Sequence, residues 1–224
     1  MTSTGDAQKV GKGRTRIGKV LFTKDQIEAR LDELAREIQK RYADRELTVV
    51  AVLKGSLFFT ADLVRRLEIP VRVDILEVAS YFDGTVPSED AVLSTYLASD
   101  VRGRHVLVVD DILDTGATLA GVLELVRREE PESLATCVFL RKKRKRKIDV
   151  PVEFCGFEVK AREFVVGYGL DYAQRYRNLP YLAVLEQART RVARDGKKKK
   201  GARTKRTKSR RSTRKRSRSS SRKK

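Results

Sequence analysis

The segment from Val106 to Leu119, VLVVDDILDTGATL, constrains the fold of this chain more than any other stretch. Its apolar, β-branched start is typical of a strand buried in a parallel sheet, and apolar residues at helical spacing then continue to Arg128. Between strand and helix lie two adjacent acids, two aliphatic residues and Asp-Thr-Gly-Ala-Thr. This order predicts an α/β domain, which binds ligands at the carboxyl edge of its sheet. The loop is therefore the predicted active site.

The composition of this loop favours a phosphate. Five residues open the helix: Asp114, Thr115, Gly116, Ala117 and Thr118. Backbone N–H groups and two hydroxyls can converge there on one anion, aided by the helix dipole, and a phosphate monoester is the simplest such anion. Asp110 and Asp111 come just before, and two carboxylates beside a phosphate suit either Mg²⁺ or the cis-hydroxyls of a ribose.

The Asp-Thr-Gly triplet also occurs in other kinds of site. Aspartic proteases need two such loops in an all-β fold, and this chain has no second Asp-Thr-Gly or Asp-Ser-Gly. Phosphatases of the Asp-x-Asp-x-Thr type need acids two residues apart, whereas Asp111 and Asp114 are three apart. An ordinary turn with Asp114 and Thr115 as N-caps stays open as an alternative, although it does not explain the acid pair.

Charge is spread unevenly along the 224 residues. Of the 50 Lys and Arg residues, 17 lie between Lys197 and Lys224, where there is no acid, so the other 196 residues carry 33 basic and 30 acidic side chains.

The length and the 40% hydrophobic content fit a single core. The two cysteines, Cys137 and Cys155, lack metal-site spacing and fit a reducing cytoplasm. No run suits a membrane helix, and residues 1–16 lack the apolar stretch of a signal peptide.

Further segments extend the α/β pattern. Thr23 and Gln26 predict a capping box before a surface helix of about 20 residues. Thr48 to Leu53 is a second buried strand, followed by Lys54-Gly55-Ser56 and a second helix. The remaining predicted elements are strands at Val71–Val78 and Leu134–Leu140 and a short terminal helix at Glu186–Asp195.

Two stretches between these elements are irregular. The stretch from Ser80 to Asp100 is long for a compact domain, so we expect a lid or disorder there. The run from Arg141 to Lys147, RKKRKRK, reads by itself as a solvated basic loop or a nucleic-acid patch. His105, the single histidine, precedes a strand without a partner nucleophile, which favours a structural role.

Several segments of the chain carry a family resemblance. The hydrophobic run, acid pair, two aliphatic residues and Asp-Thr-Gly-x-Thr are similar to the phosphoribosyl-pyrophosphate (PRPP) signature of type I phosphoribosyltransferases. Leu-Lys-Gly-Ser at 53–56 resembles the pyrophosphate loop of the hypoxanthine-guanine members, and the hood segment, Arg162 to Asn178, REFVVGYGLDYAQRYRN, closely resembles the part that receives the base. The resemblance covers about Gly18 to Leu185, with four motif blocks in family order. It implies a central, mostly parallel sheet flanked by helices, with a small hood.

The resemblance assigns roles around PRPP. It implies that backbone amides at Lys54 and Gly55, with the lysine side chain, meet pyrophosphate, and that the peptide bond before the lysine is often cis. Asp110 and Asp111 would bind the ribose hydroxyls and their Mg²⁺, and the loop from Asp114 to Thr118 would hold the 5-phosphate. Asp114 would also act as general base at N7 of the purine.

The resemblance also assigns residues to the purine and to closure of the site. Phe164 would stack on the base, Val165 would offer backbone groups to its edge, Asp171 would bind a second Mg²⁺, and Arg177 would contact pyrophosphate. The Ser80-Tyr81 pair matches the start of a mobile loop that closes over the site and excludes water.

One further role falls in the basic run. Counting back from IDVPVEF places Lys142 where the family has the lysine that donates to the purine O6. The family more usually has proline at the next position, where this chain has Lys143, so Lys143 stays open as the alternative. An ammonium group only donates hydrogen bonds, which suits a 6-oxo group and not the 6-amino group of adenine.

The predicted function is therefore transfer of the phosphoribosyl group from PRPP to hypoxanthine or guanine, by a homodimer or homotetramer in the cytoplasm. Two alternatives stay open: a transferase of the same fold for xanthine or another base, and a PRPP-sensing regulator that binds nucleic acid. Intact Asp114, Lys54 and Asp171 argue against the regulator.

The predicted domain organisation has three parts. Residues 1–16 are a disordered lead-in, 17–190 form the transferase domain with its hood, and 191–224 form a Lys, Arg and Ser-rich tail. The tail has almost nothing to bury, so we expect it to be disordered. Its charge suits non-specific binding of nucleic acid.

Overall fold

The computed structural model of the chain describes residues 15–78, 97, 100–145 and 148–187. Outside these residues lie positions 1–14 of the predicted lead-in, the predicted lid residues Ser80 and Tyr81, and the predicted tail at 191–224. Within the described part, no helix combines the length and apolar character needed to cross a bilayer.

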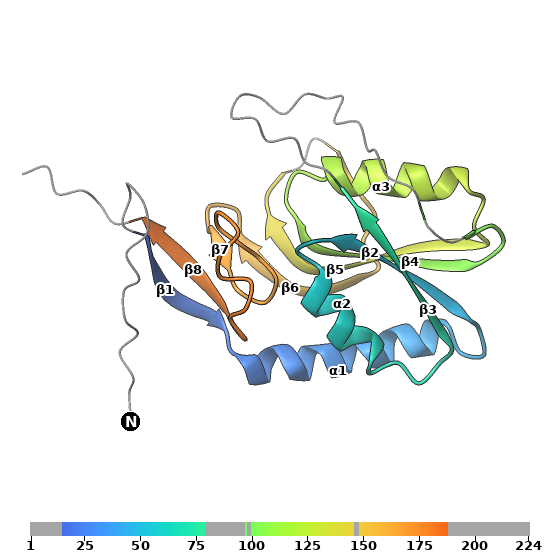
Figure 1. Cartoon of the computed structure of the whole chain (residues 1–224), viewed down its shortest axis with the longest axis horizontal. Coiled ribbons are helices and arrows are strands. Elements are labelled where there is room, and N and C mark those ends of the chain that lie inside the picture. The colour runs from blue at the N-terminus through green and yellow to red at the C-terminus, as the bar shows by residue number, and fades with distance from the viewer. Residues whose placement is uncertain (1–14, 79–96, 98–99, 146–147, 188–224) are drawn as a thin grey trace, which may run out of the picture. The chain divides into compact units, whose positions relative to one another are not determined.

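The centre of the fold is a five-stranded parallel sheet with the order β3-β2-β4-β5-β6 (Figure 1). Its strands are β2 (Leu47–Leu53), β3 (Val71–Glu77), β4 (His105–Leu113), β5 (Ser133–Lys143) and β6 (Phe154–Lys160). β4 lies in the middle, as its continuous apolar run predicts, and Val106 to Val109 are fully buried. The prediction of a parallel sheet is confirmed.

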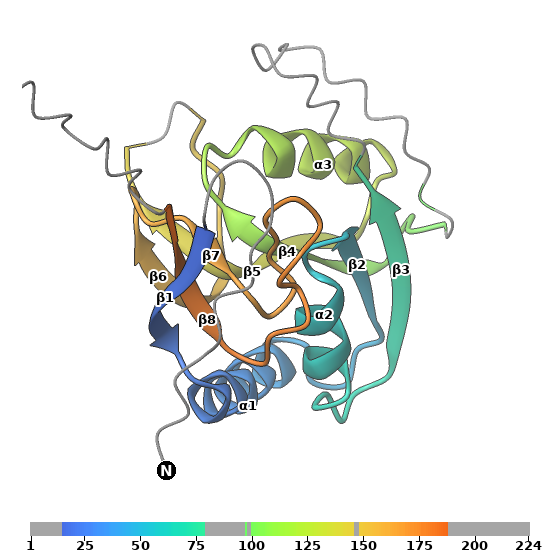
Figure 2. The same ribbon diagram turned by 60° about the vertical axis from the view of Figure 1, so that its left-hand side comes forward.

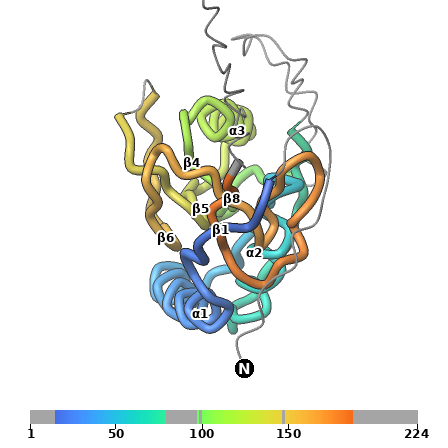
Figure 3. The backbone as a smooth tube through the Cα atoms, turned by 90° about the vertical axis from the view of Figure 1, so that its left-hand side faces the viewer, coloured from blue at the N-terminus to red at the C-terminus, as the bar shows by residue number. Residues whose placement is uncertain are grey.

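Three helices cover the two faces of the sheet: α1 (Lys24–Arg41), α2 (Leu57–Val64) and α3 (Ala117–Arg128). Figure 3 shows α3 on one side of the strands and α1 with α2 on the other. The predicted capping box begins α1, where the Thr23 side chain accepts from the Gln26 backbone and the Gln26 side chain accepts from the Thr23 backbone. α1 buries the helical stripe Ile27, Leu31, Leu34, Ala35 and Ile38.

The core has two layers because strand residues alternate between faces. Val49, Leu107 and Cys137 pack toward α1 and α2, whereas their neighbours Val50, Val108 and Val138 pack toward α3. This two-sided burial fixes the register of the parallel strands, since a shift of one residue would exchange the two layers.

A second, antiparallel sheet has the order β1-β8-β7 and lies beside the first (Figures 1 and 2). We call it the hood sheet; its strands are β1 (Thr15–Phe22), β7 (Val165–Val166) and β8 (Leu182–Gln187). Two sequence-based boundaries were wrong here. Thr15 and Arg16 belong to β1 and not to the lead-in, and Glu186 belongs to β8 and not to a helix. Each strand is fixed by pairing with a partner about 170 residues away, which no local pattern reports.

Candidate active site

The carboxyl ends of β2, β4 and β5 meet at one edge of the sheet, because these neighbouring strands are parallel. The polar segments that follow them are therefore brought together. Lys54 to Ser56 follows β2, Asp114 to Gly116 follows β4, and Lys142 and Arg144 lie at the end of β5. Leu113 is level with Arg141 in the strand register, which places Asp114 opposite Lys142.

The acid pair lies inside β4, whereas the sequence placed it in the loop after the strand. Asp110 is buried, with 6% of its surface exposed, and its Oδ1 accepts a hydrogen bond of 2.9 Å from the backbone N–H of Asp111. Burial and then the negative charge of Asp111 raise the pKa of Asp110 well above its usual range. Burial also raises the pKa of Asp111, although hydrogen bonds and the charge of Arg177 oppose the rise. Two adjacent carboxylates, of which Asp110 is buried, suit a cationic or hydroxyl-rich ligand.

Glycine at position 55 lets the loop after β2 lie directly on the acid pair. A Cβ atom at Gly55 would overlap the Oδ2 atom of Asp111, so no larger residue fits. A second glycine, Gly169 of the hood segment, has φ +96° and lies against the carbonyl oxygen of Gly55. The loop after β2, the acid pair and the hood segment are thus stacked without intervening side chains. The Leu53–Lys54 peptide bond is cis, as the family resemblance implies.

The Asp-Thr-Gly turn leads into the start of α3. Gly116 precedes the helix with φ 91°, a left-handed conformation that favours glycine, and packs against the carbonyl of Ile148. Thr115 contributes its Oγ1 as acceptor for the Ala117 N–H, at 3.4 Å, and Thr118 is exposed on the first turn. The first N–H groups of a helix have no partner within it. This end of α3 can therefore receive an anion.

Asp114 is held by two cations at the end of β5. Its Oδ2 accepts from Lys142 Nζ at 2.7 Å, and its Oδ1 accepts from Arg144 Nη1, also at 2.7 Å. Burial opposes ionisation of Asp114, but the hydrogen bonds from Lys142 and Arg144 offset it, so the pKa of this carboxyl lies below its usual value. Lys143, the alternative candidate for the purine lysine, points elsewhere and pairs with Glu158 at 2.9 Å.

The hood segment brings Phe164 and Val165 to the edge strand β7. Phe164 is 49% exposed, and its ring meets Tyr172 edge-on with centroids 5.6 Å apart. The Phe164 carbonyl accepts from the Leu185 N–H at 2.8 Å, so Phe164 and Leu185 form a hydrogen-bonded pair of the antiparallel ladder. The main-chain groups of the next residue, Val165, then point away from β8 toward the open edge. An exposed ring beside main-chain groups that face the open edge of the sheet suits a flat heterocycle.

Asp171 and Arg177 form one unit in the same segment. Arg177 Nη2 lies 2.9 Å from Asp171 Oδ1, and its Nη1 donates to the Gly169 carbonyl at 2.6 Å. Lys54 is exposed and lies 3.7 Å from Glu77. Lys54 and Arg177 both line an open groove of about 1040 Å³. Two cations facing one groove can neutralise a polyanion.

Comparisons with known proteins agree with this geometry. The family model described as phosphoribosyl transferase domain matches residues 20–173. The chain belongs to this family. It is 46% identical over 166 residues to the hypoxanthine phosphoribosyltransferase of Salmonella typhimurium, covering 73% of this chain and 93% of that protein. It is 41% identical over 172 residues to the hypoxanthine-guanine phosphoribosyltransferase of Bacillus subtilis, covering 77% and 95%. The crystal structure of a Staphylococcus aureus hypoxanthine phosphoribosyltransferase is similar with a TM-score of 0.72 at 36% identity, covering 76% of this chain and 92% of that one.

The type I phosphoribosyltransferase fold predicted from sequence is therefore confirmed. The geometry of this phosphoribosyltransferase also shows contacts that the sequence-based prediction missed. Arg144 was treated as part of a solvated run, and Gly169 was not singled out. The alternation of side chains along an extended strand was the available signal for Arg144, because it puts residues 142 and 144 on one side.

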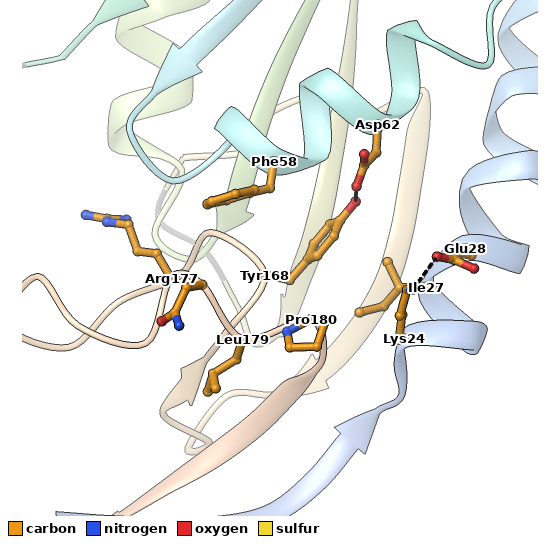
Figure 4. Close-up of a pocket in the computed structure, with 10 residues that line it drawn as sticks. Lys24, Ile27, Glu28, Phe58, Asp62, Tyr168, Arg177, Leu179 and Pro180 are labelled. Carbon is orange, nitrogen blue, oxygen red and sulfur yellow. Dashed lines mark hydrogen bonds and ion pairs between the residues drawn. The ribbon is translucent and has the colours of Figure 1, made fainter. Parts of the chain in front are cut away.

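A small cavity of about 200 Å³ lies between the hood segment and helices α1 and α2 (Figure 4). Tyr168 of the hood segment reaches toward α2, and its hydroxyl donates to Asp62 at 2.7 Å. Burial and the nearby Asp62 carboxylate raise the pKa of Tyr168, so it stays a neutral donor. Of the residues assigned to substrate, only Arg177 lines this cavity. We interpret the contact as an anchor that fixes the hood segment of the phosphoribosyltransferase on α2.

Proposed function

We propose that the protein transfers the 5-phosphoribosyl group of PRPP to N9 of hypoxanthine or guanine, giving IMP or GMP and pyrophosphate in purine salvage. The observation that carries this proposal is the meeting of Asp114 and Lys142 beside the start of α3. A base, a donor for the purine and an anion-binding helix end are thus available in one place. The printed names of the relatives support the same reaction.

In this proposal the protein mainly positions the two substrates. The segment from Asp114 to Thr118 receives the 5-phosphate at the start of α3. Asp110 and Asp111 accept hydrogen bonds from the ribose hydroxyls. Lys54, Arg177 and the backbone at Gly55 neutralise pyrophosphate as it leaves. Correct placement of reacting groups is itself a large part of catalysis.

The acid pair also fits Mg²⁺. The described residues contain no group of three or more His, Cys, Asp or Glu side chains arranged for a metal ion. Mg²⁺ in phosphate-transfer sites is held by one or two carboxylates together with substrate oxygens, so a pair of acids beside PRPP is sufficient. Asp110 and Asp111 would hold one ion with the ribose, and Asp171 a second. When bound, the ion neutralises charge on pyrophosphate.

Base selection is assigned to the hood segment and to the end of β5. Proton transfer is assigned to the residue that follows β4. Phe164 stacks on the purine and Val165 contacts its edge through the main chain. Lys142 donates to O6. Asp114 takes the proton from N7 as N9 attacks C1 of the ribose, for which an ionised carboxylate is required.

The test incubates the protein with PRPP and Mg²⁺ and with hypoxanthine, guanine or xanthine in separate reactions. Turnover is measured as release of pyrophosphate. We expect hypoxanthine or guanine to give a nucleotide and one pyrophosphate, and chelation of Mg²⁺ to stop the reaction. Turnover of xanthine in preference to both would favour the alternative substrate. PRPP binding without release of pyrophosphate with any base would favour a PRPP-sensing regulator.

We also propose how the protein assembles and where it acts. A homodimer or homotetramer is supported by Val73 and Ile75, which are 53% and 49% exposed on the edge strand β3. No disulfide joins Cys137 and Cys155, which supports a cytoplasmic location. Segment 197–224, with 17 basic residues and no acid, is proposed to bind polyanions such as RNA or DNA without sequence preference.

A further inference from the structure

The basic run after Leu140 is divided between two carboxylates. Arg141 and Lys143 pair with Glu158 on β6, at 2.6 and 2.9 Å. Lys142 and Arg144 pair with Asp114. This division follows from the strand, because β5 continues to Lys143 and successive side chains point to opposite sides.

Arg144 lies one residue beyond β5, but its side chain points to the same side of the chain as that of Lys142, toward Asp114. Its backbone N–H donates to the Lys142 carbonyl at 3.0 Å, which turns the chain back at this point. The two cations then take different atoms of the same carboxylate, Nζ of Lys142 on Oδ2 and Nη1 of Arg144 on Oδ1. Arg144 can therefore keep its hydrogen bond when Lys142 gives up its own.

The proposed reaction requires Lys142 to change partner. In the free protein its ammonium group binds Asp114, whereas in the complex it has to reach the purine O6. Resting on the proposed function, we propose that Arg144 is a positioning residue, which holds the Asp114 carboxylate toward N7 while Lys142 turns to the base. Arg144 touches neither substrate in this arrangement and acts through Asp114.

Arg144 also affects the proton affinity of Asp114. Among the described residues, Lys142 and Arg144 are the charged groups placed against this carboxylate, and segment 148–150 packs nearby on Gly116 through Ile148 and Val150. A cation lowers the pKa of a neighbouring carboxyl. Loss of Arg144 should therefore raise the pKa of Asp114 and shift the acidic limb of the activity profile to higher pH.

The experiment compares Arg144→Ala, Arg144→Lys and the matched control Arg141→Ala, with kcat, KM and pH profiles for hypoxanthine and PRPP. Arg144→Ala should lower kcat about tenfold, because the base is less well oriented, and should leave KM for PRPP within about twofold. Its acidic limb should move to higher pH. Arg144→Lys keeps the charge and should return that limb toward the wild-type position. Arg141→Ala, which loses a pair with Glu158 on the other side of the strand, should match the wild type.

Two outcomes of this comparison would contradict the role of Arg144. Wild-type kcat and pH profile in Arg144→Ala would overturn the positioning role, and so would an equal loss in Arg141→Ala. Arg144 is 43% exposed, so we expect the variant to fold, and the melting temperature checks this. If Arg144→Ala unfolds, Arg144→Gln takes its place with the same expected losses. Absence of turnover by the wild-type protein would instead overturn the proposed function.

Discussion

At the scale of single residues, Asp114 connects the two halves of the proposed chemistry. It directly follows β4, in the turn that is proposed to bind phosphate, and it contacts the lysine that is proposed to select the base. Its pKa lies below the usual value, so it is ionised at neutral pH and free to accept a proton.

Replacing Asp114 with Asn should lower turnover of hypoxanthine by about 10²-fold or more, since general-base catalysis typically contributes that much. PRPP binding should largely persist, because Asp110, Asp111 and the start of α3 are unchanged. Steady-state kinetics and PRPP titration measure the two effects separately. Near-normal turnover in Asp114→Asn would remove this carboxylate from the mechanism.

Lys142→Ala should remove most of the catalytic efficiency for 6-oxopurines and narrow the gap to adenine, because the donor that discriminates between them is lost. The ratio of kcat/KM for hypoxanthine to that for adenine is the measurement. Lys143→Ala is the control and should keep the wild-type ratio, since Lys143 pairs with Glu158. The reverse outcome would show that the purine lysine is Lys143.

The residue types at the site could be named from the sequence, but the partners of several could not. Lys142 was placed by counting back from IDVPVEF, but its contact with Asp114 was not predicted. The pairing of Arg144 depends on the turn that follows β5 and on which side β4 lies. A run of like charges does not contain that information.

At the scale of elements, the site is a stack of loops whose spacing depends on glycine. Gly55 touches the acid pair on one side and Gly169 on the other, with no room for a side chain between them. The main-chain contacts at this stack are what the proposed pyrophosphate site is built from.

Gly55→Ala should therefore raise KM for PRPP and lower turnover strongly, because the new methyl group displaces the loop from Asp111. Gly103→Ala is a suitable control: Gly103 has φ +64°, but a Cβ atom there meets nothing within 4 Å. Gly103→Ala should lower the free energy of unfolding by about 1 kcal/mol through backbone strain alone and leave KM for PRPP unchanged. Kinetics and melting temperatures of both variants provide the comparison. Equal kinetic effects in the two variants would contradict the role of the stack.

Element types were predictable from periodicity, and the errors lie at boundaries that depend on distant partners. β4 continues through the acid pair to Leu113 and β5 through the first three basic residues, because each pairs with its neighbour to that point. The predicted terminal helix begins as strand β8, since Glu186 is paired with Arg16 of β1. Long-range pairing decided these positions over local propensity.

At the scale of the whole molecule, the catalytic part and the basic charge are separate in the sequence. The match to the family covers 20–173, and every residue assigned to the reaction lies before position 178. Most of the net charge of +20 comes from segment 197–224.

Truncation after Asp195 should leave turnover of hypoxanthine unchanged and remove most retention on nucleic acid at low salt. Binding of this kind comes from release of counterions, so affinity of the full chain should fall steeply with salt. Filter binding at several salt concentrations, with RNA and DNA of unrelated sequence, measures this. Retention that survives truncation would assign binding to the 141–147 run, and loss of turnover would show that the tail belongs to the folded domain.

The most direct test of the account is competition between hypoxanthine and adenine at equal concentration, with PRPP, Mg²⁺ and the full-length protein. The ratio of IMP to AMP formed equals the ratio of kcat/KM for the two bases. A site with Asp114 as base and Lys142 as donor to O6 predicts IMP in excess by about 10³-fold or more, because adenine leaves the lysine without an acceptor. Comparable amounts of IMP and AMP, or no nucleotide at all, would contradict the account.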